Sequence, residues 1–453
     1  MGAASLCRAR GPFTEGGAHT RSRKRSTHMR RIAFHTLGCK VNQYDTQAML
    51  ESFQAAGWEV CGFEEQADAY VINTCTVTGT GDKKSVQLIR RVHREHPEAA
   101  IVVTGCLAQR DPNRVTLPGV RLVLGTAKRA QAAQLLERAL AGNLALIEVN
   151  TLKGAAFEPL TINSHEGKTR ATMKIQEGCD RYCTYCIIPY VRGPVRSMEL
   201  DAVAAEAGRL AKAGYREVVV TGIHLTSYGR GMGVELCDAL EAVGRVEGIR
   251  RIRLGSLEPY YVTEERARRL ADMDKLCRQF HLSMQSGSAG VLDRMHRRYT
   301  PDDYARGVEL LRKYMPGCAI TTDVLTGFPG ETEAEAAETL AFVERMGFAR
   351  IHVFPYSRRS GTVADRLPGQ VPEAVKHARA AELIALGGRL REAYERAALG
   401  SVREVLLEEE TGTGMCEGYT REYLRVRAPG APGEIASVRL TELDGDCIIG
   451  ERV

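Results

Sequence analysis

The chain has 453 residues, of which 44% are apolar and 26% charged, a composition typical of a folded protein with room for about three domains. No apolar run approaches the ~20 residues of a membrane span, so we expect no membrane partner. The net charge of +6 is no evidence for a nucleic-acid partner, because residues 1–28 hold six Lys and Arg against one Glu and the rest is nearly neutral.

The thirteen cysteines are odd in number and unevenly spaced. Residues 1–29 form a basic stretch, poor in apolar residues, without the apolar segment of a secretory signal, and we expect them to be disordered. This favours a cytoplasmic location, where thiols stay reduced. The cysteines are therefore expected to serve metal binding or catalysis and to have no disulfide partner.

Residues 30–143 alternate between strand-like and helix-like segments, which predicts an open parallel α/β domain. A helix is expected at 42–56, and strands at 32–37, 69–73, 101–104 and 121–124. Cys39, Cys75 and Cys106 each follow one of the first three strands. Because these loops meet at one sheet edge, the three thiols are predicted to form a cluster site. The alternative is three buried cysteines that close the ends of strands.

Residues 144–167 lose this periodicity and are interpreted as a linker. Residues 168–398 return to alternation, with a helix pattern at 200–211 and strands at 171–176, 217–221, 251–254, 280–284, 319–325 and 351–354. Six strand–helix units predict a partial, TIM-like (β/α)6 barrel. Its catalytic site would lie at the carboxyl ends of the strands.

Cys179, Cys183 and Cys186 form a C-x3-C-x2-C loop directly after the first of these strands, with Tyr185 before the last cysteine. Thiolates favour iron–sulfur clusters and zinc, and a structural zinc site usually takes four protein ligands. Three thiolates instead suit a 4Fe–4S cluster with one open iron. This spacing resembles the signature of radical S-adenosylmethionine (SAM) enzymes. A zinc knuckle or structural cysteines are the alternative.

Polar and glycine residues at the ends of the later strands are candidates to bind SAM. Glycine lets a ligand approach the backbone, and a carboxylate can accept hydrogen bonds from ribose hydroxyls or an ammonium group. Helix capping and turn formation explain the same residue types equally well. Together with Tyr185, the candidates are Gly222, Ser256, Glu258, Gln285 and Asp323.

A long helix is expected at 374–399. Residues 399–453 then show short strand patterns, at 402–408, 423–427, 435–440 and 446–453, which predict a small OB-like barrel. Its six Arg against eleven Asp and Glu give no basic field. Four arginine pairs along the chain are expected on solvated faces, with phosphate contact as the alternative: 90–91, 250–251, 297–298 and 358–359.

Three segments, 36–42, 73–77 and 177–193, carry a resemblance that spans residues 30–453. They read TLGCKVN, NTCTV and EGCDRYCTYCIIPYVRG, and they resemble the radical-SAM methylthiotransferase family. The first segment and Gly-Ile-His at 222–224 are most similar to the branch that modifies N6-threonylcarbamoyladenosine in tRNA.

The resemblance implies two 4Fe–4S clusters and SAM. It implies that Cys179, Cys183 and Cys186 hold the catalytic cluster, and that the cluster on Cys39, Cys75 and Cys106 carries the inserted sulfur. It also implies an RNA-binding TRAM barrel at residues 399–453. The implied partners are a tRNA anticodon stem-loop and an electron donor such as flavodoxin or ferredoxin.

Other substrates and functions stay open from the residues. The same chemistry on isopentenyladenosine in tRNA, or on an aspartate of a ribosomal protein, is the first alternative. The second is a non-catalytic metal-binding RNA module.

Overall fold

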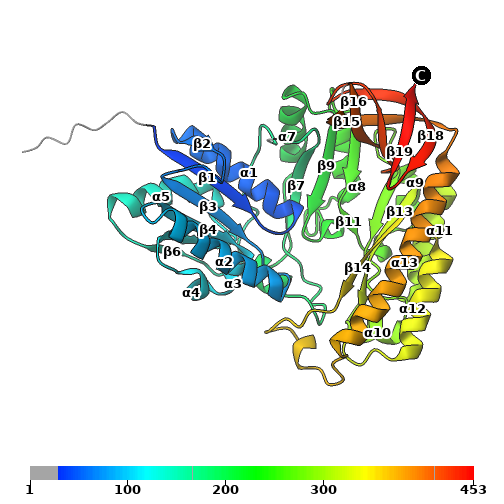
Figure 1. Ribbon diagram of the computed structural model, residues 1–453, viewed down its shortest axis with the longest axis horizontal. Helices are drawn as coiled ribbons and strands as arrows, with labels where there is room; N and C mark the ends of the chain where they lie inside the picture. Colours follow the sequence, from blue (N-terminus) through cyan, green and yellow to red (C-terminus); the bar gives the residue numbers. More distant parts are fainter. Residues whose placement is uncertain (1–28, 166, 413) are drawn as a thin grey trace, which may run out of the picture.

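The computed structural model describes residues 29–165, 167–412 and 414–453. In chain order they form an α/β sheet, a half-open barrel of parallel strands and a small closed β-barrel (Figure 1). The basic leader expected at residues 1–29 lies outside the described residues except for Met29. No helix in the described part of the chain is long and apolar enough to cross a membrane.

The first sheet confirms the predicted parallel α/β fold. Its order is β2-β1-β3-β4-β5-β6, with β1 (Arg31–Thr36), β2 (Glu59–Cys61), β3 (Ala69–Thr74), β4 (Ala100–Gly105), β5 (Val120–Leu124) and β6 (Leu146–Glu148). β3 and β4 are buried along their whole length, so they read as continuous apolar runs. The sequence does not predict β2 and β6, because three residues show no periodicity. β6 lies in the segment expected as a linker and pairs with β5.

Helices cover both faces of this sheet. Met49 and Phe53 of α1 (Lys40–Ala55) pack with α5 (Ala132–Ala141) on one face. Ile89 and Val92 of α2 (Gly79–Glu95) pack on the other face, together with α3 (Cys106–Arg110) and α4 (Pro112–Val115). Because parallel strands all end at one edge, α1 and α3 begin at the same edge of the sheet, and α1 reaches across to β7 of the second part.

The second part has the six parallel barrel strands that the sequence predicts. They are β7 (Ala171–Glu177), β9 (Glu217–Gly222), β10 (Arg251–Leu254), β12 (Gln279–Leu282), β13 (Ala319–Thr326) and β14 (Arg350–Pro355). Two short strands, β8 (Arg196–Ser197) and β11 (Ser256–Leu257), complete two four-stranded sheets. A bridge between Ile252 and Leu276 joins these sheets, and the barrel stays open between β8 and β14.

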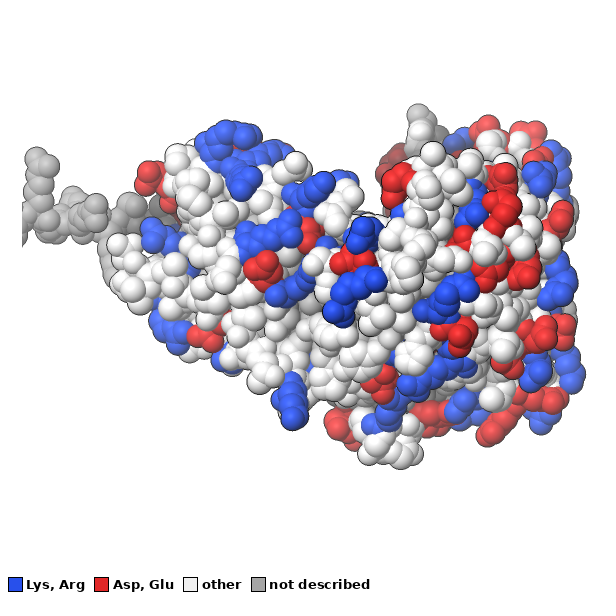
Figure 2. Space-filling model, turned by 90° about the horizontal axis from the view of Figure 1, so that it is seen from below, with Lys and Arg blue, Asp and Glu red and all other residues white. Residues whose placement is uncertain are grey.

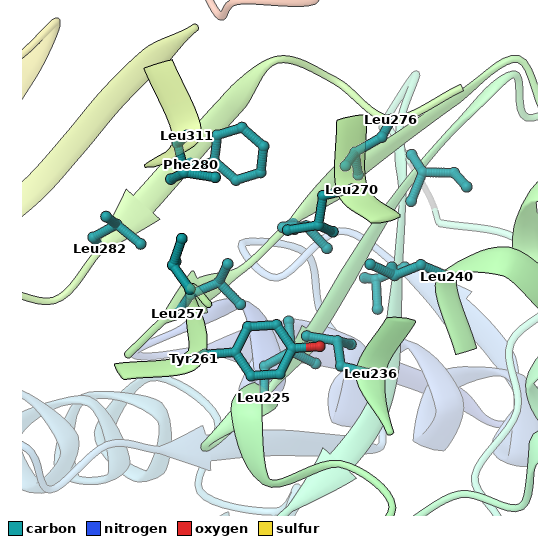
Figure 3. Packing of buried hydrophobic residues seen from close by; sticks show 14 of the residues in the cluster. Leu225, Leu236, Leu240, Leu257, Tyr261, Leu270, Leu276, Phe280, Leu282 and Leu311 are labelled. Atoms are coloured by element: carbon teal, nitrogen blue, oxygen red, sulfur yellow. The ribbon is translucent and has the colours of Figure 1, made fainter. Parts of the chain in front are cut away.

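Helices cover the outside of this barrel, and the apolar core lies beneath them. The helices are α7 (Leu200–Lys212), α8 (Leu236–Gly244), α9 (Glu264–Ala271), α10 (Ala289–Arg294), α11 (Pro301–Tyr314) and α12 (Glu333–Met346). Phe280 of β12 lies against Leu311 of α11, and Leu236 and Leu240 of α8 line the same cluster (Figure 3).

Strand β14 has one face toward the helices and one toward the open interior of the barrel, its lumen. A Cβ atom on Gly387 of α13 (Glu373–Ala398) would lie 2.5 Å from Ile351, so Ile351 faces outward. Because side chains alternate along a strand, His352 and Phe354 face the lumen. Both are exposed, whereas Ile351 and Val353 are half-buried, which fits this alternation.

The third part is a closed barrel in the order β15-β16-β17-β19-β18. Its strands are β15 (Val402–Gly412), β16 (Met415–Thr420), β17 (Arg425–Pro429), β18 (Ile435–Asp444) and β19 (Cys447–Arg452). The small OB-like barrel is therefore confirmed. β16 is missed by the sequence because Gly418 interrupts its apolar alternation. β17 and β19 pair in parallel, and the other pairs are antiparallel.

The closed barrel sits on the base of the half-open barrel, near the amino ends of its strands (Figure 1). Arg251 Nη1 donates to the Tyr419 carbonyl at 3.0 Å, and Arg253 Nη2 donates to the Thr420 carbonyl at 3.0 Å. The expectation of solvated arginine pairs is wrong for Arg251, Arg297 and Arg359, whose side chains are at most 6% exposed. Arg251 and Arg359 pair with the buried carboxylates of Glu217 and Asp82, and Arg297 pairs with half-buried Glu258, which offsets the cost of burial.

A candidate active site with two cysteine trios

The C-x3-C-x2-C loop leaves the carboxyl end of β7 through a tight turn. Gly178 has φ +78°, and a Cβ atom there would lie 1.9 Å from the Pro194 carbonyl oxygen, so only glycine fits. Cys179 N–H then donates to the Gly193 carbonyl at 3.0 Å. Thr184 donates from its N–H to the Met295 carbonyl at 3.1 Å and from its hydroxyl to the Arg294 carbonyl at 2.8 Å. These bonds fix the loop at the rim of the lumen.

The thiols of this loop, called the barrel trio (Cys179, Cys183 and Cys186), lie in a partly buried setting. Burial raises the pKa of Cys179 to about 11 and that of Cys186 to about 12. Arg297 Nη1 lies 3.3 Å from Cys183 Sγ. These two half-buried thiols therefore stay protonated at neutral pH until a metal displaces their protons, which is the behaviour of metal ligands.

The second set, called the sheet trio (Cys39, Cys75 and Cys106), follows β1, β3 and β4, which are neighbours in the first sheet. A Cβ atom on Gly38 would lie 3.0 Å from Cys75 Sγ, so the first and second loops are in contact. The Cys39 thiol raises the pKa of Cys75 and Cys106 by charge repulsion, although burial is the larger cause for both. The pKa of buried Cys106 reaches about 11. The topology thus brings together three cysteines that are far apart in sequence.

Arg192 connects the two trios. It ends α6 (Ile188–Arg192), the helix that follows the barrel trio, and its Nε donates to Cys106 Sγ at 3.2 Å. Its Nη1 lies 3.0 Å from both Asp45 and Glu177, and its Nη2 donates to Asn42. The side chain is fully buried. One guanidinium group therefore positions the sheet trio relative to the barrel loop.

A buried charge network surrounds Arg192. Asp45 of α1 and Glu177 of β7 each accept from Arg192, Arg129 and Lys174. All five side chains are at most 2% exposed. Burial is the largest single influence on both carboxyl groups and raises their pKa, but the three cations together outweigh it and lower the pKa of both. Because the partners come from both parts of the molecule, the network sets how the first sheet meets the barrel.

The candidate SAM-binding residues lie on barrel strands or in the loops that follow them. Gly222 ends β9, Ser256 lies on β11, and Gln285 follows β12 with φ +68°. Gln285 N–H donates to the Asp323 carbonyl at 2.9 Å. Tyr185 turns inward and packs edge-on against Phe328, with ring centroids 6.5 Å apart.

Two of these candidates are engaged by neighbouring side chains. Glu258 accepts from Arg297 Nη2 at 2.6 Å, and Asp323 lies 3.3 Å from His281 Nε2. Sequence reasoning does not select Arg192 or His281, and it names Arg297 only in an arginine pair expected on a solvated face, because no spacing rule marks a residue that acts through a folded contact. Arg192 does stand in the segment YVRG, which offers the one signal that could have found it.

Each trio supplies the donors that an iron–sulfur cluster requires, namely thiols on loops beside buried cations. In the described part of the chain, no three His, Cys, Asp or Glu side chains are gathered closely enough to hold a single metal ion. The donor sets fit clusters that spread their thiolates more widely than one zinc ion with ~2.3 Å bonds.

An open parallel barrel with a three-cysteine loop after its first strand defines a class, the radical SAM enzymes. A model of the Radical SAM superfamily matches residues 173–343, and one described as uncharacterized protein family UPF0004 matches residues 31–125. Among solved structures, the radical SAM methyltransferase TsrM from Kitasatospora setae with cobalamin and a [4Fe-4S] cluster bound has a TM-score of 0.56 at 18% identity. It covers 75% of this chain and 77% of that chain, which shows the shared fold.

Curated relatives match nearly the whole chain. Threonylcarbamoyladenosine tRNA methylthiotransferase MtaB from Bacillus subtilis is 43% identical over 91% of this chain and 94% of that protein. The MtaB protein of Aquifex aeolicus is 38% identical over 84% of this chain and 93% of that protein. A tRNA-2-methylthio-N(6)-dimethylallyladenosine synthase from Moorella thermoacetica is 36% identical over 92% of this chain and 97% of that protein. The chain therefore belongs to the radical SAM tRNA methylthiotransferase family. Its cofactors are SAM and two 4Fe–4S clusters.

Proposed function

We propose that this enzyme adds a methylthio group to carbon 2 of N6-threonylcarbamoyladenosine beside the anticodon of tRNA. The identity of 43% with the MtaB protein of Bacillus subtilis is the observation that carries this substrate. The dimethylallyladenosine branch is the second candidate, because the Moorella protein is 36% identical. The two substrates differ in one decisive group, since the threonylcarbamoyl side chain carries a carboxylate and the dimethylallyl side chain is apolar.

Lys40 supports the proposal of a substrate with an anionic side chain. Lys40 follows Cys39 directly, at the start of α1, and its charge acts on His352 of β14 and Tyr423 of the closed barrel. Among the described residues, Lys40 has no carboxylate within ion-pair distance. A substrate carboxylate can supply that partner through a charged hydrogen bond, which a dimethylallyl group cannot form.

The places of the six cysteines in the fold support the roles that we propose for them. The barrel trio would hold the cluster whose open iron binds SAM, and the sheet trio would hold the cluster that carries the sulfur to be inserted. Together these groups supply radical formation and sulfur chemistry when bound. The chain's own residues link the two parts of the site through Arg192, and Arg297, which contacts both Cys183 and Glu258, places Glu258 beside the barrel trio.

Iron and acid-labile sulfide analysis tests the cluster assignment. The wild type, reconstituted without oxygen, should hold about eight irons per chain, and the Cys179→Ala, Cys183→Ala, Cys186→Ala triple variant about four. A Cys39→Ala, Cys75→Ala, Cys106→Ala variant should also hold about four. A Cys237→Ala variant is the matched control, because Cys237 is a buried cysteine of the barrel core. A sheet-trio variant that keeps eight irons would refute the assignment.

Nucleoside mass spectrometry tests the substrate. The enzyme is incubated with SAM, a reductant (flavodoxin or ferredoxin as the proposed physiological donor, dithionite as control) and one of two tRNAs. One tRNA carries N6-threonylcarbamoyladenosine and the other isopentenyladenosine. We expect the methylthio product only from the first tRNA. Product from the second tRNA alone would assign the enzyme to the dimethylallyladenosine branch. If the enzyme methylthiolated only an aspartate of a ribosomal protein, a tRNA substrate would be excluded.

A further inference from the structure

In the described part of the chain, three aromatic side chains are largely exposed, and all three lie around the mouth of the lumen. Tyr182 is 52% exposed, Tyr190 56% and Phe354 52%. Tyr182 directly precedes Cys183, Tyr190 lies on α6 just after Cys186, and Phe354 stands near the carboxyl end of β14 on its lumen face. An aromatic ring stabilises a fold most when it is buried. Three exposed rings at one site therefore indicate a binding function there.

Tyr182 and Tyr190 form a pair with a defined geometry. Their ring centroids are 5.8 Å apart and the ring planes meet at 77°, which leaves the face of at least one ring free. Tyr182 has φ +48°, an uncommon conformation for a tyrosine. The backbone is nevertheless held on both sides, because Cys179 and Thr184 are anchored by hydrogen bonds to Gly193 and Met295. The exposed ring is therefore presented by a rigid loop.

Two exposed aliphatic side chains extend this rim. Val77 is 51% exposed and lies two residues after Cys75 of the sheet trio. Val363 is 46% exposed, and the next residue, Ala364, donates its N–H to the Thr184 carbonyl at 2.8 Å. The rim is thus apolar on the barrel side and on the sheet side of the site. We call Tyr182, Tyr190, Phe354, Val77 and Val363 the aromatic rim.

Positive charge lies beside the aromatic rim. Arg110, Arg114 and Arg359 all pair with one carboxylate, that of Asp82, so this cluster has two cations in excess. Arg110 also donates to the Ser360 carbonyl, which places the cluster against the loop that carries Val363. In the view from below, Lys and Arg side chains lie over the left and the middle of the face, and on the right they are mixed with Asp and Glu (Figure 2). An anionic backbone is favoured at such a place.

From this arrangement we infer that the aromatic rim binds unpaired nucleobases of an RNA loop by stacking, next to the base that enters the lumen. Stacked rings accept any base, and Arg114, whose side chain is 44% exposed, would meet a phosphate between the bases. A base inside the lumen must leave its own stack, so its neighbours lose stacking partners that Tyr182 and Tyr190 replace. This inference rests on the proposed tRNA substrate. It adds the residues that hold the loop open.

The test uses the full-length holoenzyme and an anticodon stem-loop with 2-aminopurine next to the target adenosine. The fluorescence of 2-aminopurine is quenched by stacking, and anisotropy of a labelled stem-loop gives the affinity. Tyr182→Leu and Tyr190→Leu keep apolar bulk but remove the aromatic ring. Each should relieve the quenching and weaken binding about 5- to 150-fold, the equivalent of about 1–3 kcal/mol per stacked base. Tyr182→Phe and Tyr190→Phe should bind like the wild type.

Ile384→Ala is the matched control, because Ile384 is 58% exposed on α13 and carries no ring. Wild-type affinity and quenching in both leucine variants would overturn the inference. The leucine variants could instead bind RNA normally, lose turnover with flavodoxin as the electron donor and keep full turnover with dithionite. That result would overturn the inference and show that the rim is a docking surface for the reductase. Failure of the wild type itself to bind or modify tRNA would instead refute the proposed function.

Discussion

Arg192 Nε lies 3.2 Å from Cys106 Sγ, although the two residues are 86 positions apart and belong to different parts of the fold. The arginine follows the barrel trio in sequence and contacts the sheet trio in space. The same guanidinium group pairs with Asp45 of the first part and Glu177 of the second. A single buried side chain, that of Arg192, therefore fixes the position of the sheet trio relative to the loop that carries the barrel trio.

Replacement of Arg192 by leucine should destabilise the protein and empty the sheet trio. It leaves Asp45 and Glu177 with one cation fewer inside the protein, a loss of about 3–5 kcal/mol by analogy with other broken buried pairs. Urea unfolding measures this loss, and iron analysis should fall from about eight to about four irons per chain. Arg91→Leu removes an exposed pair with Glu64 and Glu95 and should cost at most about 1 kcal/mol. Equal effects of the two variants would contradict this reading of Arg192.

Arg297 should tune the cluster of the barrel trio. Its Nη1 is 3.3 Å from Cys183 Sγ, and a nearby cation favours the reduced, more negative cluster. Arg297→Gln should therefore shift the reduction potential to a more negative value and slow reductive cleavage of SAM. A redox titration followed by electron paramagnetic resonance measures the shift. Arg298→Gln, at the exposed neighbouring position, should leave the potential unchanged; an unchanged potential in both variants would show that Arg297 has a structural role alone.

Lys40 should discriminate between the two tRNA substrates. Lys40→Gln removes the ammonium group beside Cys39, and loss of a charged hydrogen bond costs about 1.5–3 kcal/mol. We expect kcat/KM for the threonylcarbamoyladenosine stem-loop to fall about 10- to 150-fold. Methylthiolation assays on stem-loops with and without the threonyl carboxylate measure the ratio. Iron content must stay at the wild-type value for the comparison to hold. An equal loss on both substrates would speak against carboxylate recognition.

Glu206 of α7 should make stability depend on pH. Burial raises its pKa from 4.5 to about 7, and its Oε1 lies 2.7 Å from the Tyr44 hydroxyl. The Tyr44 hydroxyl also lies 2.6 Å from the Leu160 carbonyl and has one proton to donate. A protonated Glu206 donates to Tyr44, which then donates to Leu160, so the neutral carboxyl satisfies both bonds.

The folded state thus binds a proton that the unfolded chain releases between pH 4.5 and 7. The free energy of unfolding should therefore fall as pH rises through this window, by about 3 kcal/mol in total. Glu206→Gln imitates the neutral form, so it should remove this slope and be more stable than the wild type at pH 8. Exposed Glu338→Gln is the control. Parallel pH profiles of the wild type and Glu206→Gln would disprove the assignment.

The sequence by itself determined the local features of this protein. The alternation of strands and helices predicts the parallel sheet and the six barrel strands, because periodicity follows from which side chains a strand or helix buries. The spacing of Cys179, Cys183 and Cys186 likewise points to a cluster loop, because three ligands within eight residues are close in any fold. The sequence does not predict short edge strands such as β2 and β6.

The tertiary structure alone decided how the two trios meet. Cys39, Cys75 and Cys106 converge because β1, β3 and β4 are neighbours in a parallel sheet, a pairing that depends on distant segments. The buried contacts of Arg192, Arg297 and Arg359 escape any local pattern for the same reason. An arginine is buried only where folding brings a carboxylate to it, and the partners of Arg359 lie 277 residues away, at Asp82. Local sequence fixes which chemistry is available, and long-range packing fixes where it acts.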